Sequence, residues 1–116
     1  MDLWKTVGRE EAVCEVCSTV GFVNPDHRLN AHHLIGKRNR RLRWHLRNRV
    51  WLCPTHHTLG TQSAHGDSPW FLNWCGTYRK EDLDFCNSVK QEIYKATVEK
   101  LEAIIENLKN NVRDTY

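Results

Sequence analysis

Residues 48–57, which read NRVWLCPTHH, combine a strand, a pair of metal ligands and the start of a helix. The RVWL segment (49–52) alternates in the way that is typical of a strand. Pro54 cannot continue a strand but suits the first turn of a helix, so we expect a short helix over residues 55–59. Cys53 and His56 stand on either side of this junction, and both are common zinc ligands.

A second pair with the same spacing, Cys14 and Cys17 in CEVC, comes earlier in the chain. Together the two pairs supply four donors, which predicts a closed tetrahedral zinc site made of Cys14, Cys17, Cys53 and His56. His57 is an alternative fourth ligand, although the spacing favours His56. A redox pair or ordinary buried cysteines are the competing interpretations, but no βαβ pattern surrounds the motif. The chain has five cysteines, and an odd number disfavours a disulfide framework.

Two adjacent histidines lie in the segment HRLNAHHLI (27–35), which is short, partly apolar and typical of a strand. Neighbouring strand residues point to opposite faces, so one of His32 and His33 can face a metal while the other faces water or substrate. His57 would lie about 100° around the helix axis from His56. If His56 binds zinc, His57 is therefore able to face His32.

The basic residues of the chain are concentrated in one segment. Between residues 28 and 49 there are eight arginines and lysines and no acidic residue, whereas the whole chain has a net charge of only +3. We expect this segment to bind the phosphates of double-stranded DNA, with a solvated charged loop as the alternative. Trp44 within it is expected to pack beneath the loop. The predicted DNA-binding residues are Lys37, Arg38, Arg40, Arg41, Arg43, Arg47 and Arg49.

The length of 116 residues fits a single domain, residues 1–116, with a metal-binding core at 14–57. A Ser-Pro pair predicts a short helix over residues 68–76. From residue 81 to residue 113, apolar side chains recur every three or four positions without proline or glycine, which predicts one long C-terminal helix. Its apolar stripe would pack on the domain or pair two copies, so we expect a monomer or a homodimer.

Residues 1–13 predict a short amphipathic segment anchored by Leu3, Trp4 and Val7. No apolar run approaches the roughly 18 residues of a membrane-spanning helix, and the N-terminus lacks the apolar core of a signal peptide. We therefore expect no membrane partner and a cytoplasmic location. Cys75 and Cys86 have no partner at ligand spacing and are interpreted as structural thiols.

The order of the motifs CEVC, AHHLIG, NRVWLC and CPTHH resembles that of zinc-ribbon HNH endonucleases of bacteria and phages, over residues 14–57. The resemblance implies an α+β fold in which a small ββα-metal core, a hairpin followed by a helix, is stapled by a zinc ribbon. The long C-terminal helix lies outside the resemblance. The resemblance also implies hydrolysis of a DNA phosphodiester, and nicking is expected because one such site cuts one strand at a time.

The resemblance also implies a role for each matching residue. His33 would be the general base that activates water, and Asn48 would support the hairpin loop and the orientation of that base. His32 and His57 would hold one catalytic divalent ion, Mg²⁺ or Mn²⁺, beside the structural Zn²⁺. Many family members have an acidic residue in place of His32, and the softer imidazole lets other metals compete with Mg²⁺. Whether His65 adds a ligand stays open.

A non-catalytic zinc-ribbon DNA-binding module is the alternative function. It needs the cysteines and the arginines but not His33, and it binds one metal ion per chain. The endonuclease depends on His33 and leaves 5′-phosphate and 3′-hydroxyl ends, as the resemblance implies. A nuclease that processes RNA is a third hypothesis, which a comparison of DNA and RNA substrates separates from the first.

Overall fold

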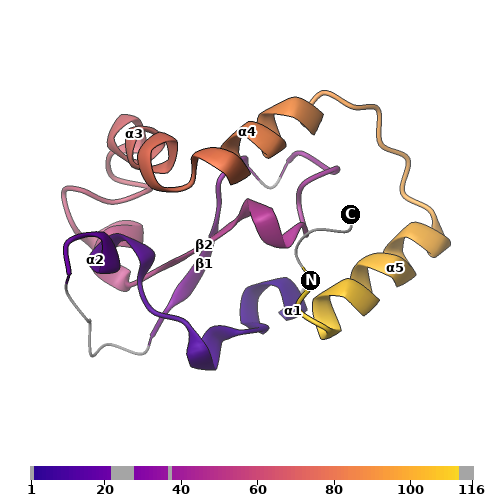
Figure 1. Cartoon of the computed structure of the whole chain (residues 1–116), viewed down its shortest axis with the longest axis horizontal. Coiled ribbons are helices and arrows are strands. Elements are labelled where there is room, and N and C mark those ends of the chain that lie inside the picture. The colour runs from indigo at the N-terminus through magenta and orange to yellow at the C-terminus, as the bar shows by residue number, and fades with distance from the viewer. Residues whose placement is uncertain (1, 22–27, 37, 113–116) are drawn as a thin grey trace.

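A two-stranded antiparallel sheet lies at the centre of the computed structural model, which describes residues 2–21, 28–36 and 38–112 (Figure 1). β1 (Asn30–His33) pairs with β2 (Arg49–Leu52), and His33 lies opposite Arg49. β2 has the predicted bounds and is buried along its length, whereas β1 is shorter than the predicted strand at 27–35. With helices around this sheet, the fold is α+β, as the sequence predicts.

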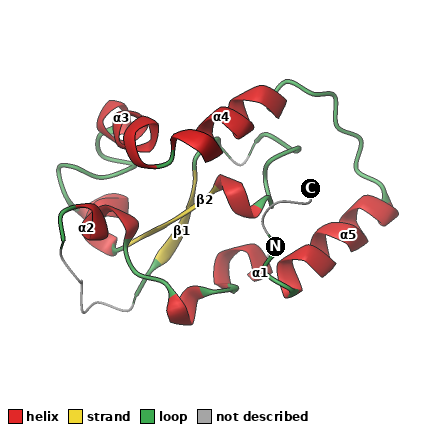
Figure 2. Ribbon diagram, in the orientation of Figure 1, coloured by secondary structure: helices red, strands yellow, loops and turns green. Residues whose placement is uncertain are grey.

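Short helices surround the sheet, as Figure 2 shows. α2 (Glu15–Thr19) contacts β2, while α3 (Ser68–Tyr78) and α4 (Lys80–Val89) contact each other. α1 (Asp2–Thr6) contacts both β1 and α5 (Val98–Lys109). The other helical segments are 3-10 turns at Arg9–Glu11 and Leu46–Asn48 and one π-helical turn at Thr55–Leu59. Every helix in the described part of the chain is too short or too polar to cross a bilayer.

Apolar side chains form two separate clusters. The larger one fills the space between the sheet, α2, α3 and α4, and its buried members include Val16, Leu42, Val50, Leu52, Phe71, Trp74 and Cys86. The smaller one consists of Trp4, Leu46 and Leu108, with Trp44 half-buried against it, so Trp44 packs as predicted. Because α1 supplies Trp4 and α5 supplies Leu108, this second cluster ties both ends of the chain to the centre.

The prediction of one continuous helix over residues 81–113 is wrong. α4 and α5 are separated by residues 90–97, which are not helical, and Ile93, expected in the apolar stripe, is 95% exposed. α4 buries Cys86 in the larger cluster, and α5 buries Leu108 in the smaller one. A straight helix would carry these two side chains about 33 Å apart along its axis. The break lets α5 turn back and pack against α1 instead.

Thr97 supplies the local signal for the second helix. Its hydroxyl accepts a hydrogen bond from the backbone N–H of Lys100 at 3.1 Å, which caps the N-terminus of α5. A cap of this kind lies inside the 81–113 segment, where the apolar spacing alone predicts no interruption. The capping residue, rather than a proline or glycine, therefore marks the start of α5.

α3 begins at residue 68, as predicted, but it has a different capping residue and a later end than the predicted helix at 68–76. Asp67 caps it, because the Asp67 carboxylate accepts the backbone N–H of Trp70 at 3.1 Å. A carboxylate also interacts favourably with the positive end of the helix dipole. The helix continues through Gly76 to Tyr78, since Phe71 and Trp74 bury its inner face.

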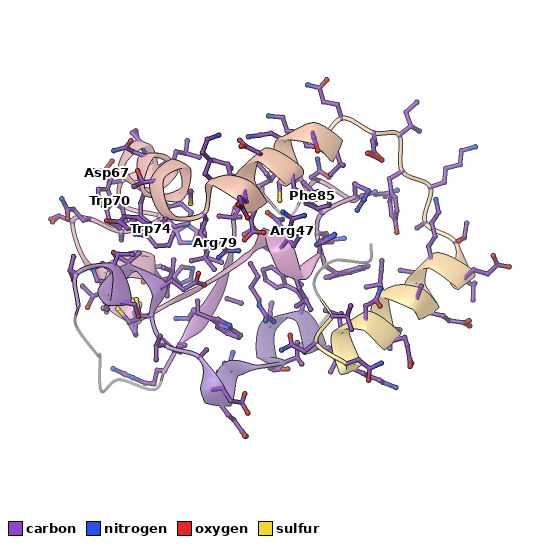
Figure 3. The ribbon with its side chains drawn as sticks, in the orientation of Figure 1. Arg47, Asp67, Trp70, Trp74, Arg79 and Phe85 are labelled. Atoms are coloured by element: carbon purple, nitrogen blue, oxygen red, sulfur yellow. The ribbon has the colours of Figure 1, made fainter. Side chains whose placement is uncertain are left out.

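Arg79, between α3 and α4, is the centre of a polar network (Figure 3). Its guanidinium lies 2.8 Å from carboxylate oxygens of both Glu15 and Asp82, and it donates to the backbone carbonyl of Arg49 at 2.9 Å. Asp82 is paired in turn with Arg47 at 2.8 Å. The network therefore joins α2, the sheet and α4.

Replacing Arg79 by alanine is expected to lower the free energy of unfolding by roughly 3–5 kcal/mol, because the Glu15 carboxylate loses its contact with the guanidinium and Asp82 keeps Arg47 but loses Arg79. The side chains of Arg79 and Asp82 are only 12% and 13% exposed. Lys80→Ala is the matched control, since Lys80 pairs with Asp84 at the surface, where both side chains are more than half exposed. That change should cost less than about 1 kcal/mol. Urea unfolding of both variants measures the difference, and equal losses would contradict the assignment.

Candidate metal centres and cleft

Three cysteines and one histidine converge at the junction of α2, β2 and the π turn. Nδ1 of His56 lies 3.6 Å from Sγ of Cys14, 3.4 Å from Sγ of Cys17 and 3.3 Å from Sγ of Cys53. Two of the sulfurs, those of Cys17 and Cys53, are 3.9 Å apart. A tetrahedral zinc ion, with bonds of about 2.3 Å to sulfur and 2.0–2.1 Å to nitrogen, spaces its ligands by roughly 3.5–3.8 Å. These four residues can therefore hold a zinc ion as they stand.

Local structure explains how the four ligands meet. Cys14 occupies the N-cap position of α2, Cys17 lies within that helix, and Cys53 follows β2 directly. The backbone N–H of His57 donates to the carbonyl of Cys53 at 2.9 Å, and this bond joins the end of β2 to the π turn Thr55–Leu59. All five cysteines are free, and the sulfur separation above exceeds the roughly 2.05 Å of a disulfide. A histidine among three thiols favours metal binding over a redox pair.

A second cluster consists of His32, His57 and His65, whose nitrogens lie within 4.8 Å of one another. Nε2 of His57 and Nε2 of His65 are 3.1 Å apart. The ring of His32 is centred 5.2 Å from that of His57 and 4.8 Å from that of His65. His56 and His57 are therefore neighbours in sequence that belong to different clusters, as the rotation of a helical turn predicts.

His65 is the member of this cluster that the sequence leaves open. The loop after the π turn folds back, so that the backbone N–H groups of Ala64 and His65 donate to the carbonyls of His56 and His57 at 2.8 and 3.1 Å. Gly66 permits this path, because a Cβ there would lie 2.5 Å from the hydroxyl oxygen of Ser63. No spacing rule in the sequence indicates such a return.

The environment keeps the imidazoles of His32 and His57 neutral. Burial, and then the neighbouring His57, His65 and His33, lower the pKa of His32 to about 3. Burial, and then His65, also lower the pKa of His57. Neutral imidazole is the form that binds metal ions. Three imidazole ligands with an open position form the kind of site found in catalytic metal centres.

His33, the predicted general base, has different contacts from His32. Its Nε2 lies 2.8 Å from the backbone carbonyl oxygen of Arg43, and its ring stacks on Trp4 with centroids 3.9 Å apart. A carbonyl oxygen only accepts, so Nε2 carries the proton and Nδ1 carries the lone pair. A cleft of about 500 Å³ is lined by His33 together with all three histidines of the second cluster.

Other residues of this cleft come from parts of the chain for which the sequence predicts no function. Trp4 and Lys5 enter from α1, and Phe71 and Leu72 enter from α3. The edge of the Phe71 ring faces His32 at a centroid distance of 5.0 Å. The motifs within residues 14–57 do not indicate these residues, because α1 and α3 both lie outside that segment.

Asn48 lies at the base of the loop that follows β1, and it is completely buried. Its amide donates to the carbonyls of Ile35 and Leu42 at 2.9 and 3.1 Å, and its oxygen accepts the N–H of Ile35 at 2.7 Å. The side chain therefore clamps both ends of the 35–42 segment. Asn48 does not line the cleft, so its contacts are with the loop rather than with the cleft.

Asn48→Ala is expected to lower the free energy of unfolding by at least about 3 kcal/mol, since it leaves buried backbone groups without partners. Asn39→Ala is a useful control, because Asn39 bonds the same loop to Lys90 from a more exposed position. Thermal unfolding of both variants provides the measurement. A smaller loss for Asn48→Ala than for Asn39→Ala would contradict the clamp.

The basic residues of the 28–49 segment divide into two groups. Arg47 is paired with Asp82, and Arg49 is only 9% exposed and donates to the carbonyl of Trp4 at 3.0 Å, so these two side chains are engaged within the fold and are not expected to contact DNA. Arg41 lies 3.7 Å from Glu92. The exposed residues that form no ion pair with any described residue are Arg38, Arg40 and Arg43, and Lys37 lies outside the described residues.

No protein-family model, curated protein or solved structure matches this chain. The two clusters and the cleft are therefore the features of the molecule that bear on its function. The four-ligand site has the donor set of a structural zinc site, while the three-histidine cluster opens to solvent through the cleft. The four-ligand site and the three-histidine cluster therefore differ in their access to solvent and in the function each one suits.

Proposed function

We propose that this chain is a metal-dependent endonuclease of the HNH type that hydrolyses a phosphodiester bond in double-stranded DNA, nicking one strand at a time. The observation that carries the proposal is that His33 and the cluster of His32, His57 and His65 line the same cleft. A base and a divalent-ion site beside one another are the groups that phosphodiester hydrolysis requires.

The residues of the cleft would act as follows. Nδ1 of His33 accepts a proton from the attacking water, while its Nε2 stays bonded to the carbonyl of Arg43. His32, His57 and His65 would hold the divalent ion, which supplies stabilisation of negative charge on the phosphate and the leaving oxygen. Three imidazole ligands favour Mn²⁺ over Mg²⁺.

The exposed cations supply the expected contacts to the DNA backbone. Lys5 lines the cleft, and Arg43 belongs to the basic loop and accepts the hydrogen bond from Nε2 of His33 with its own backbone carbonyl. Arg38 and Arg40 are exposed on the same loop. These contacts are to phosphate and should be largely independent of sequence and sensitive to salt.

The helix that the HNH family places after the second strand corresponds here to the single π turn Thr55–Leu59. This turn still presents His56 to the cysteines and His57 to the cleft. α3 lines the cleft from the next part of the chain. The assignment to the ββα-metal type therefore rests on the placement of the histidines rather than on helix length.

Incubation of supercoiled plasmid with the zinc-loaded protein tests the proposal. We expect nicked product with added Mn²⁺ and, more slowly, with Mg²⁺, and none with His57→Ala. Metal analysis should give two ions per chain for the parent protein in Mn²⁺ and one for His57→Ala. A protein that retards duplex DNA but cuts nothing, with or without Mn²⁺, would instead be a non-catalytic zinc-ribbon DNA-binding module. Faster cutting of RNA of the same sequence would indicate an RNA-processing nuclease.

A further inference from the structure

The ring of Trp4 covers one face of His33. The two ring centroids are 3.9 Å apart and the ring planes differ by 12°, so the contact is a parallel stack. Trp4 is 1% exposed and comes from α1, whereas His33 ends β1. Both residues line the cleft that holds the histidine cluster.

Both rings are bonded to the same short backbone segment. Nε2 of His33 donates to the carbonyl of residue 43, and Nε1 of Trp4 donates to the carbonyl of residue 45 at 3.0 Å. Hydrogen bonds to ring nitrogens lie in the ring plane, so they restrain rotation within that plane. Stacking restrains tilt out of it. Together these contacts restrain the orientation of the imidazole in two independent ways.

Trp4 is itself fixed at several points. Its carbonyl accepts a bond from the guanidinium of Arg49 at 3.0 Å, and Arg49 is the residue paired with His33 across the sheet. Its indole packs against Leu46 and Leu108 in the smaller apolar cluster. A rigid support of this kind is what keeps a reacting group within the narrow range of geometries that catalysis tolerates.

We propose that Trp4 is a positioning residue for the general base, and that α1, outside the segment 14–57, is thus a functional part of the active site. The inference rests on the proposed nuclease function of His33. Trp4 holds the imidazole plane so that Nδ1 points into the cleft. Loss of the flat indole surface should slow the chemical step without weakening the binding of DNA.

Trp4→Leu is the informative variant, because leucine keeps an apolar side chain but offers no planar face. We expect kcat for plasmid nicking to fall about 100-fold, the loss typical of a reacting group displaced by about 1 Å, with KM unchanged. Trp4→Phe restores a planar ring and should recover most of the rate. Leu108→Ala is the control, since Leu108 belongs to the same apolar cluster. Each variant is assayed at a temperature at which circular dichroism shows it folded.

A second readout does not depend on activity. Stacking on the indole shifts the imidazole proton resonances of His33 upfield in the NMR spectrum of the zinc-loaded protein, and this shift should vanish in Trp4→Leu and persist in Leu108→Ala. If the parent protein nicks no DNA, the nuclease proposal fails while the stack can still be seen. If the parent protein nicks DNA but Trp4→Leu keeps its kcat, or if Leu108→Ala loses as much, the positioning role is overturned.

Discussion

Replacing Cys53 by alanine is expected to unfold the whole domain rather than to weaken it locally. Zinc binding by four ligands of this kind contributes roughly 10–16 kcal/mol of apparent free energy, whereas a domain of this size has a net stability of only about 5–15 kcal/mol. Cys53 is 1% exposed and directly follows β2. Loss of its thiolate removes the link that the zinc ion makes between the end of the sheet and the π turn. Circular dichroism should show loss of helix, and metal analysis should show loss of zinc.

Cys75→Ala is the matched control for this experiment. Cys75 is also 1% exposed and belongs to the larger apolar cluster, but it lies in neither metal cluster. Its loss removes one sulfur atom from the core and should cost on the order of 1 kcal/mol, leaving a folded, zinc-loaded protein. If both variants unfold alike, or if Cys53→Ala retains one tightly bound zinc ion, the four-ligand site is contradicted.

Replacing His33 by alanine is expected to lower the rate of DNA nicking by roughly 10²–10⁴-fold, which is the usual contribution of a general base. The loss should be confined to catalysis, because His33 lies outside the histidine cluster that would hold the divalent ion. The variant should therefore retain both metal ions and the affinity for duplex DNA. Single-turnover nicking of plasmid, together with metal analysis and gel retardation, measures the three properties.

His32→Ala provides the contrast for His33→Ala. His32 is the adjacent residue on β1, but it faces the histidine cluster, so its loss should remove the second metal ion as well as activity. Added imidazole should restore part of the rate to His33→Ala, since a small base can occupy the vacated space, and none to His32→Ala. Unchanged nicking by His33→Ala would refute the assignment of the base.

Sequence reasoning succeeds in this chain where the signal is local. The bounds of β2 and each of the two ligand pairs, Cys14 with Cys17 and Cys53 with His56, follow from spacing within a few residues, because a strand and a two-residue ligand turn have fixed geometries. The meeting of the two pairs follows from their chemistry instead, because a closed zinc site needs four donors. The separation of His56 from His57 follows in the same way. Local periodicity and ligand spacing contain enough information for these features.

Sequence reasoning fails where partners are distant along the chain. The basic segment contains no carboxylate, yet Arg47 is neutralised by Asp82, 35 residues later. His65 reaches the cluster through backbone bonds to the π turn, and Trp4 reaches His33 through the packing of α1. The break after α4 is also caused by distant partners. The apolar spacing runs without interruption through both helices, but α4 packs in the larger cluster and α5 in the smaller one.

The π turn Thr55–Leu59 has a consequence for the order in which the protein assembles. His56 belongs to the cysteine cluster and His57 to the histidine cluster, so one turn of backbone contributes to both. Zinc bound to His56 would fix the backbone that carries His57, in addition to the backbone bonds from Ala64 and His65. We therefore expect zinc binding at the cysteines to precede metal binding by the histidines, so that the domain folds first and the cleft takes up its ion afterwards.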